Sequence, residues 1–404
     1  MTLQASYIVK GCRTPVGKLR GSLSGVRTDD LAAIPIRALL NYFDNLDPLF
    51  INDVILGCAN QAGEDNRNVA RMASLLAGLP FNVPGETINR LCASGMSAVI
   101  HAHRSILAGD ADLILAGGVE QMTRAPYVLS KSATPFGNDA TIFDSSFGWR
   151  FINPEMKRLF GTDAMGETAE NLADMYQISR EDQDSFACWS QNKAYSAVKA
   201  GLFKEEIIDV EIKNDKKQNV LFSEDEFIRP DTTIEGLTKL RPVFRKDGSV
   251  TAGNTSGIND GAAAMLIASS KALTVHDLTP MARIVSSGIV GVEPRIMGIG
   301  PVGASKLALK KAGLSLDNMD VIEINEAFAV QVLACTRLLG LSDTDIRLNP
   351  NGGAIALGHP LGMSGTRILL TAALELRRRK KRYALITMCV GVGQGYAVII
   401  ENCL

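Results

Sequence analysis

The chain repeats itself, and this repeat restricts its possible folds more than any other feature. The segment "DVILGC" at 53–58 returns as "DVIEIN" at 320–325, and "GMS" at 95–97 returns at 362–364. The same offset of 267 residues separates 53 from 320 and 95 from 362. Self-similarity over such a long period indicates a duplicated structural unit. We therefore expect two similarly folded halves.

Both copies alternate helical and strand-like patterns. After each "GMS", an amphipathic helical pattern, "AVIHAHRSILAG" or "GTRILLTAALEL", leads into a short apolar strand at 111–118 or 382–389. This alternation predicts an α/β fold in which helices cover parallel sheets. The halves are expected at about 1–122 and 273–404.

The segment between the halves has a different character. Residues 123–249 are more charged and more aromatic, and they have no repeat partner. They contain a predicted helix with Ser179 as its N-cap and Gly201 beyond its end. The glycine-rich, apolar stretch that follows is expected to return to the first sheet. The predicted domains are 1–122 completed by 250–272, an insert at 123–249, and 273–404.

The charge balance gives no reason to expect a nucleic acid or an anionic membrane as a partner. There are 42 Lys and Arg residues against 43 Asp and Glu residues, a net charge of −1. The basic run "RRRKKR" at 377–382 is interpreted as the solvated end of a helix. No secretory signal is recognisable, and no apolar run reaches the roughly 18 residues of a membrane span. Seven cysteines without paired spacing indicate a reducing compartment, so we expect a cytoplasmic protein.

One thiol is a candidate nucleophile. Cys92 lies in "NRLCASGMS" at 89–97, at the expected start of a helix. The positive end of a helix favours a thiolate, so a lowered pKa is expected there. Because cysteine is often fully buried, the alternative is a small core residue.

The repeat supplies a partner for this thiol. The 267-residue offset takes position 92 to His359, in "NPNGGAIALGHPLGMSG" at 349–365. If the halves pack about a pseudo-two-fold axis, these equivalent loops converge. A thiol beside an imidazole is the pair that nucleophilic acyl transfer requires. The alternative is a structural histidine in a glycine-rich loop.

Two further loops carry groups suited to stabilising an oxyanion. Cys389 ends an apolar strand in "MCVGVGQG", where alternate glycines beginning at Gly391 leave backbone N–H groups accessible. Asn325 follows another strand in "INEAFA" and can orient a water or donate to an oxyanion. The alternatives are a tight turn and a helix cap.

Four blocks together resemble the signatures of the thiolase family, CoA-dependent enzymes that cleave or form 3-ketoacyl-CoA. They are "NRLCASGMSAVIHA", "NEAFA", "NPNGGAIALGHPLGMSGTR" and "CVGVGQGYA". The resemblance extends from "RTPVG" near the start to "GVGQG" near the end. It implies two α/β halves with mixed five-stranded sheets in αβαβα layers, plus an inserted loop domain. It also implies a homodimer or homotetramer that uses CoA as a co-substrate, with no permanently bound cofactor and no metal.

The resemblance implies a role for each candidate. Cys92 matches the nucleophile that becomes acylated, and His359 matches the histidine that activates it and helps hold the thioester oxygen. Cys389 matches the cysteine that exchanges a proton with the acetyl-CoA carbon. Asn325 matches the asparagine that fixes a water in one oxyanion hole. The backbone N–H groups of Cys92 and Gly391 match the second oxyanion hole.

The insert resembles the family's CoA-binding loop domain. Arg229 in "FIRPDTT" matches a position near the nucleotide end of CoA, although it could be only a surface charge. Three other positions match the lining of the pantetheine tunnel, and they are Ser256, Met297 and Phe328.

Two stretches resemble thiolases of aromatic-compound degradation, which cleave 3-oxoadipyl-CoA into succinyl-CoA and acetyl-CoA. They are residues 55–80 and 147–165. Ala164 stands where acetoacetyl-CoA thiolases tend to have histidine. The distal carboxylate of such a substrate requires a cation or hydrogen-bond donors. Its unranked candidates, each of which could instead be a surface or interface arginine, are Arg67, Arg124 and Arg150.

Other functions remain open from sequence alone. A thiolase of fatty-acid β-oxidation or an acetoacetyl-CoA thiolase would use the same catalytic groups. A ketoacyl synthase would be expected to have a second histidine where Asn325 stands and to lack Cys389. An inert acyl-CoA-binding protein would be expected to lack both thiols. A zinc site of Cys92, His359 and Cys389 is disfavoured because the three lack paired spacing.

Overall fold

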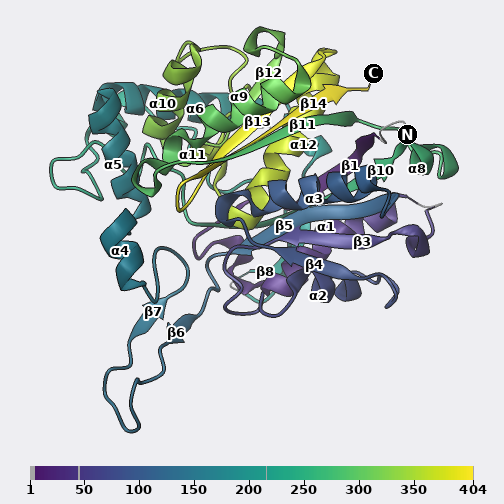
Figure 1. Ribbon diagram of the computed structural model, residues 1–404, viewed down its shortest axis with the longest axis horizontal. Coiled ribbons are helices and arrows are strands. Elements are labelled where there is room, and N and C mark those ends of the chain that lie inside the picture. Colours follow the sequence, from purple (N-terminus) through teal and green to yellow (C-terminus); the bar gives the residue numbers. More distant parts are fainter. Residues whose placement is uncertain (1–4, 44–45, 215, 404) are drawn as a thin grey trace.

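A computed structural model describes residues 5–43, 46–214 and 216–403. Its main strands follow one hydrogen-bonded path, β12-β13-β14-β11-β1-β10-β5-β3-β4, and β2 pairs with β10 (Figure 1). The bounds are β1 (Ser6–Arg13), β2 (Gly17–Lys18), β3 (Asp53–Gly57), β4 (Gly85–Ile88), β5 (Leu113–Gln121), β10 (Asn259–Ser269), β11 (Ala282–Gly291), β12 (Val321–Ile324), β13 (Tyr383–Val390) and β14 (Gln394–Asn402). As predicted, β10 returns to the first half, where it lies between β1 and β5.

The two halves are joined by a very short ladder. Strand β1 pairs with β11 only through Tyr7 with Arg283 and Ile8 with Ala282. On one side of this junction lie β1, β10, β5, β3 and β4, and on the other β11, β14, β13 and β12. The sheet path is therefore continuous, but it consists of two sheets that meet at one corner.

Among the residues that the structure describes, the second half contains one strand fewer than the expected five. Where β4 pairs with β3 in the first half, the second half has a single bridge between Ile322 and Leu348. Asn349 ends this pairing because its backbone is left-handed, with φ 41°. Its side chain forms the hydrogen bonds that the backbone of a neighbouring strand would otherwise form. Oδ1 accepts from Ile324 N at 2.8 Å, and Nδ2 donates to Ile324 O at 2.9 Å. The predicted architecture is present, with its fifth strand reduced to a bridge.

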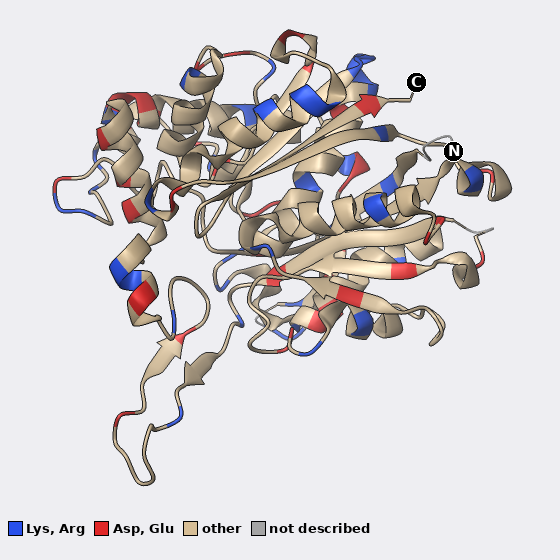
Figure 2. Cartoon of the chain, in the orientation of Figure 1, with Lys and Arg blue, Asp and Glu red and all other residues tan. Residues whose placement is uncertain are grey.

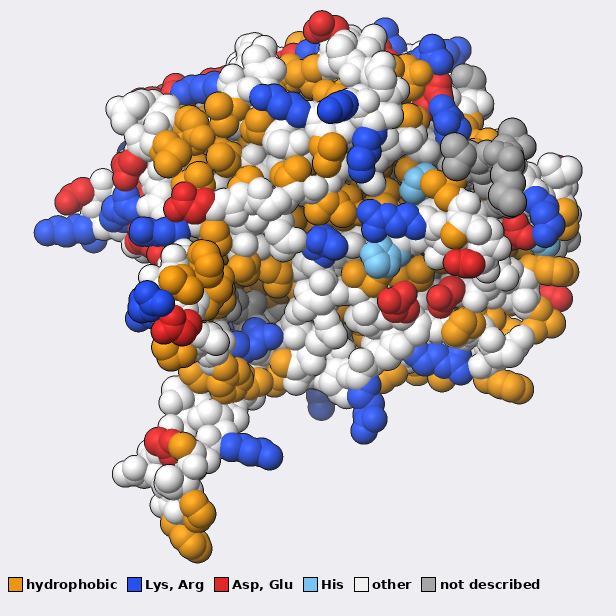
Figure 3. Space-filling view, viewed as in Figure 1, with side chains coloured by type: hydrophobic (Ala, Val, Ile, Leu, Met, Phe, Trp, Pro, Cys, Tyr) orange, Lys and Arg blue, Asp and Glu red, His pale blue; other side chains and the backbone are white. Residues whose placement is uncertain are grey.

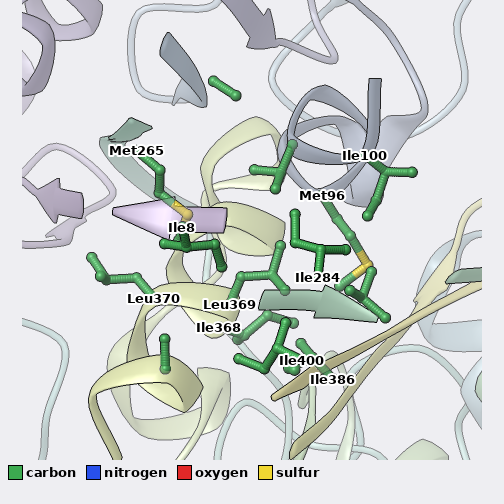
Figure 4. Packing of buried hydrophobic residues seen from close by; sticks show 14 of the residues in the cluster. Ile8, Met96, Ile100, Met265, Ile284, Ile368, Leu369, Leu370, Ile386 and Ile400 are labelled. Carbon is green, nitrogen blue, oxygen red and sulfur yellow. The ribbon is translucent and has the colours of Figure 1, made fainter. Parts of the chain in front are cut away.

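Two central helices fill the space between the sheets. Helices α3 (Ser94–Ala108) and α12 (Leu361–Arg379) begin at equivalent points of the repeat and pack on each other. Helix α3 packs on strands of the first half, and α12 packs on strands of both halves. Figure 4 shows their apolar side chains, such as Met96 and Leu369, among residues from the strands of both halves. A Cβ on Gly365 would lie 2.4 Å from Met96 N, so only glycine permits this approach.

Outer helices complete the layers. Helices α1 (Thr28–Tyr42) and α2 (Val69–Leu76) cover the outer face of the first sheet, with α8 (Ser270–Val275) beside β10. Helices α9 (Gly300–Ala312) and α10 (Ala329–Leu339) cover the second. The αβαβα order predicted from the resemblance is confirmed.

The segment between β5 and β10 packs on both halves. Its elements are β6 (Tyr127–Leu129), β7 (Ile142–Asp144), α4 (Pro154–Phe160), α5 (Met165–Tyr176), α6 (Arg180–Lys199), β8 (Val210–Lys213), β9 (Asn219–Phe222) and α7 (Ile234–Thr238). Helix α6 begins as predicted, because Ser179 Oγ accepts from Asp182 N at 3.1 Å. Leu172 and Phe186 join the core of the second half, whereas Phe222 joins that of the first.

The surface carries mixed charge and one projecting hairpin. Figure 2 shows Lys and Arg interspersed with Asp and Glu over the helices and loops. The β6–β7 hairpin extends away from the body, and Figure 3 shows hydrophobic side chains at its far end. Within the described ranges, no helix has both the length and the apolar character needed to cross a membrane.

Candidate active site

Cys92 lies where the two halves meet. It belongs to the short 3₁₀ helix η3 (Leu91–Ala93), between β4 and α3, and η3 packs against α12 and β13 of the second half. The side chain is part-exposed toward a cavity of about 350 Å³. Gly391, from the loop after β13, lines the same cavity. The nucleophile candidate and the glycine loop are thus brought together.

The free thiol is protonated at neutral pH. Burial raises the pKa of Cys92 to about 11, although the backbone N–H groups of Gly391 and of Cys92 itself act to lower it. The expectation of a lowered pKa was wrong. Cys92 precedes the first residue of α3 and lies in a 3₁₀ turn, so the helix end does not offset desolvation. Both N–H groups nevertheless lie close enough to the Cys92 sulfur to form hydrogen bonds with it in the free enzyme.

His359 is held as a neutral base. Its side chain is buried, with 4% exposed, just ahead of α12. Ser364 Oγ donates to Pro360 O at 2.8 Å, so the hydroxyl accepts from His359 Nδ1 at 2.6 Å. Nδ1 therefore carries the ring proton, and Nε2 keeps its lone pair. Burial, reinforced by the Arg367 guanidinium, lowers the pKa of His359 to about 3.

Asn325 contacts the unprotonated Nε2 of His359. It follows β12, where its N–H donates to Thr387 O of β13 at 3.0 Å. Its Nδ2 donates to His359 Nε2 at 3.3 Å. Its Oδ1 is buried and has no partner among the described residues. A buried acceptor without a partner fits a place for one small donor, such as a water.

The neighbouring Glu326 fixes the asparagine loop. Its Oε2 accepts from Ser190 Oγ of α6 at 2.6 Å, and its Oε1 accepts from Asn349 Nδ2 at 2.7 Å. Glu326 therefore ties the loop both to the inserted segment and to the glycine-rich loop that precedes His359.

Cys389 is the second thiol near Cys92. It is fully buried at the end of β13. Burial raises the pKa of Cys389 far above its usual range, and the nearby Cys92 sulfur adds to this rise. Cys92, Cys389 and Gly391 thus form one group, and His359 with Asn325 form another. Helix η3 packs on α12, and Leu361, two residues beyond His359, lines the Cys92 cavity.

Sequence reasoning missed two residues that position the site. Ser364 sets the tautomer of His359, and its place in the repeated "GMS", opposite Ser97, was an available signal. Glu120 is an acid inside the apolar strand β5, which is also a signal. Its Oε2 accepts from Gly362 N at 2.8 Å and from Ala59 N at 3.0 Å. Burial raises the pKa of Glu120 to about 7.

The predicted CoA contacts lie outside the Cys92 cavity. Arg229 is exposed, with its guanidinium 5.0 Å from the centre of the Phe227 ring. Ser256 Oγ donates to Ala327 O at 3.2 Å. Met297 and Phe328 are buried in the core of the second half. Their roles toward CoA stay predictions.

A cluster of potential metal ligands is present, but its residues are not those of the zinc alternative considered from the sequence. Among the described residues, the ligand atoms that converge within 4.8 Å belong to Cys58, Asp65 and Glu120. The Cys58 thiol donates to Asp65 at 3.6 Å, and both oxygens of Glu120 accept backbone N–H groups. The polar atoms of this cluster therefore already have hydrogen-bond partners within the protein, which favours a structural role for the cluster.

Comparison with known families decides the identity of the chain. Models of the N-terminal and the C-terminal domain of thiolase match residues 6–271 and 278–402. The chain is a thiolase. It is therefore an acyltransferase, and the matches do not favour the ketoacyl synthase or inert binding protein alternatives.

Relatives and solved structures agree over the full length of this thiolase. A beta-ketoadipyl-CoA thiolase of Escherichia coli is 58% identical over 400 residues, covering 99% of this chain and 100% of its own. A 3-oxoadipyl-CoA/3-oxo-5,6-dehydrosuberyl-CoA thiolase of E. coli strain K12 is also 58% identical, with the same coverage. The crystal structure of human mitochondrial 3-ketoacyl-CoA thiolase has a TM-score of 0.92 at 42% identity and covers 100% of both chains.

Proposed function

We propose that this thiolase cleaves 3-oxoadipyl-CoA with CoA to give succinyl-CoA and acetyl-CoA. The observation that carries the substrate is the 58% identity, over essentially the whole chain, to relatives named for this reaction. The joint cavity of Cys92 and Gly391 supports the chemistry. Thiolases of fatty-acid β-oxidation and acetoacetyl-CoA thiolases would use the same catalytic groups on substrates with other acyl chains.

In the proposed first stage, Cys92 becomes acylated. His359 Nε2 takes the thiol proton, and the sulfur attacks the C3 carbonyl of the substrate. The C2–C3 bond then breaks, and the electron pair leaves as the enolate of acetyl-CoA. Cys389 donates a proton to its carbon. Protonated His359 and a water held by Asn325 stabilise the enolate oxygen.

In the second stage, CoA resolves the acyl-enzyme. The CoA thiol gives its proton to the Cys389 thiolate, and its sulfur attacks the thioester carbonyl. As the bond between the carbonyl carbon and Cys92 breaks, His359 returns its proton to the Cys92 sulfur, which releases succinyl-CoA and restores both thiols. In this proposal the N–H groups of Cys92 and Gly391 stabilise the tetrahedral oxyanion, and their position beside the Cys92 sulfur supports that role. CoA acts as a co-substrate throughout.

Mass spectrometry tests the acyl-enzyme. After incubation with acetyl-CoA, we expect one acetyl adduct on the peptide that contains Cys92, and none in the Cys92→Ser variant. An adduct on a different peptide would overturn the assignment of roles.

The substrate is tested by comparing the turnover of 3-oxoadipyl-CoA with that of 3-ketooctanoyl-CoA. A preference for the longer aliphatic substrate would contradict the proposal that 3-oxoadipyl-CoA is the substrate.

The proposal includes a CoA path over the inserted segment. Arg229 would contact the nucleotide end, and Ser256, Met297 and Phe328 would line the route of the pantetheine arm. The exposure of Arg229 is compatible with a contact to phosphate. We expect Arg229→Ala to raise KM for CoA without a matching loss of kcat. An unchanged KM would remove Arg229 from the site.

The same proposal makes the enzyme a cytoplasmic homodimer or homotetramer. The β6–β7 hairpin supports association, because Tyr127, Leu129 and Ile142 are 74%, 66% and 64% exposed. Apolar side chains gathered on a projecting hairpin are typical of a surface that another chain covers.

A further inference from the structure

The wall of the Cys92 cavity contains one guanidinium. Residues 145–150 form part of this wall, and Arg150 is half-buried at the end of the segment. Its Nη2 donates to Asn60 Oδ1 at 3.1 Å and to Asn60 O at 3.3 Å. Its Nη1 donates to Ser145 O at 3.4 Å. Asn60 also lines the cavity, so both groups reach the space that the nucleophile faces.

This guanidinium keeps unused donors and an unneutralised charge. Its three contacts are to neutral oxygens, and among the described residues they leave the Nε hydrogen and at least one Nη hydrogen without a partner. In the described part of the chain, no carboxylate lies within ion-pair distance of Arg150. Glu120 is the acid in the same wall, but its oxygens already accept the N–H groups of Ala59, Asn60 and Gly362.

The other two candidate arginines are poorly suited to meet a ligand here. Arg124 is paired with Glu64, with Nη2 2.5 Å from Oε1, and this pair is shared with Arg27. Arg67 is exposed and does not line the cavity. The geometry therefore ranks three arginines that the sequence left unranked.

We propose that Arg150, oriented by Asn60, binds the terminal carboxylate of a dicarboxylic 3-ketoacyl chain while its carbonyl lies at Cys92. A carboxylate can accept two parallel N–H bonds from a guanidinium, which is the strongest pairing available to it. Leu91, Met165 and Leu361 line the cavity and supply apolar contacts for the methylene groups. A volume of about 350 Å³ is at the lower end of small-ligand pockets, which suits a short acyl chain.

This inference rests on the proposed function, and a matched pair of substrates separates the two. 3-Oxohexanoyl-CoA has the six-carbon chain of 3-oxoadipyl-CoA without its terminal carboxylate. We expect Arg150→Met to lower kcat/KM for 3-oxoadipyl-CoA by about 30-fold and to change that for 3-oxohexanoyl-CoA less than about 3-fold, the size of effect expected from one charge-assisted bidentate contact. Arg150→Lys should recover part of the loss, because it restores the charge without the planar fork.

The surface variant Arg67→Met serves as the control and should retain the wild-type ratio between the substrates. If the wild-type enzyme prefers 3-oxoadipyl-CoA and Arg150→Met keeps that preference, the inference is overturned and the proposed function stands. If the wild-type enzyme shows no preference for the carboxylated chain, both are overturned. Equal losses on the two substrates would make Arg150 a structural residue and would also contradict the carboxylate subsite.

Discussion

At the scale of single residues, burial sets the protonation states of Cys92 and His359, the two groups proposed to start the reaction. Desolvation disfavours whichever form of a group is charged, so it raises the pKa of Cys92 to about 11 and lowers that of His359 to about 3. Both groups are consequently neutral across the physiological range. A preformed thiolate–imidazolium pair is therefore not expected in the free enzyme, and under the proposed mechanism proton transfer accompanies attack on the substrate.

This resting state predicts the pH profile of alkylation. In the absence of substrate, the rate at which iodoacetamide modifies Cys92 should rise continuously from pH 6 to about pH 10, because the thiolate fraction grows until the pKa near 11 is reached. The residue is identified by peptide mass spectrometry. A plateau that begins below pH 8 would instead reveal an ion pair with His359.

The hydroxyl of Ser364 predicts a tautomer-dependent loss of activity. Ser364→Ala removes the acceptor of the Nδ1 proton, so the ring can place its proton on Nε2, where it cannot take the thiol proton. We expect kcat to fall about 100-fold with little change in KM, as when the partner that orients a catalytic histidine is altered. Ser97→Ala is the matched control, because Ser97 occupies the equivalent position of the other copy. A smaller effect of Ser364→Ala than of Ser97→Ala would contradict this role.

The sequence proposed these residues but did not predict their protonation states. The fixed offset relates Cys92 to His359, and a duplicated fold places such equivalent loops at equivalent ends of its two sheets. It could not predict a raised thiol pKa, since burial depends on the loops that close over the sulfur. Arg150 could not be ranked above Arg124 either, because the partner of Arg124, Glu64, lies 60 residues away.

At the scale of elements, the crossing of α3 and α12 depends on glycine. Gly365→Ala would place a methyl group 2.4 Å from Met96 N, and the backbone of α3 cannot give way without moving η3. We expect a loss of about 3 kcal/mol in the free energy of unfolding, measured by denaturant titration, because overpacking forces backbone shifts. Gly25→Ala is the control, since its Cβ would meet nothing within 4 Å. Similar stability of the two variants would refute the close approach.

Local patterns predicted the helices but not the strand that was lost. Helix α6 begins at Ser179 because capping is a short-range effect, visible in the sequence. The missing fifth strand of the second half results from the left-handed Asn349, whose side chain satisfies the backbone of β12 in place of a ladder. This replacement of a strand by a side chain depends on the Asn349 loop lying beside β12 in space, and no local sequence pattern predicts that contact.

At the scale of the whole molecule, the projecting hairpin makes association testable. Replacing Tyr127, Leu129 and Ile142 together by serine should lower the oligomeric state, because it removes exposed apolar area that water disfavours. Sedimentation velocity at several protein concentrations measures this. The matched control replaces three exposed apolar residues elsewhere, Leu75, Leu76 and Phe81. An unchanged mass for the hairpin variant would contradict the proposed role of this hairpin in association.

The position of β10 has a consequence for biosynthesis. Its neighbours β1 and β5 are complete by residue 121, but the strand that belongs between them begins only at Asn259. At ordinary translation rates a nascent chain waits roughly ten seconds for it. Until then two apolar strand edges stand open, a geometry that invites pairing with other chains. We therefore expect the chain to be most prone to pairing with other chains during synthesis, before β10 has been added.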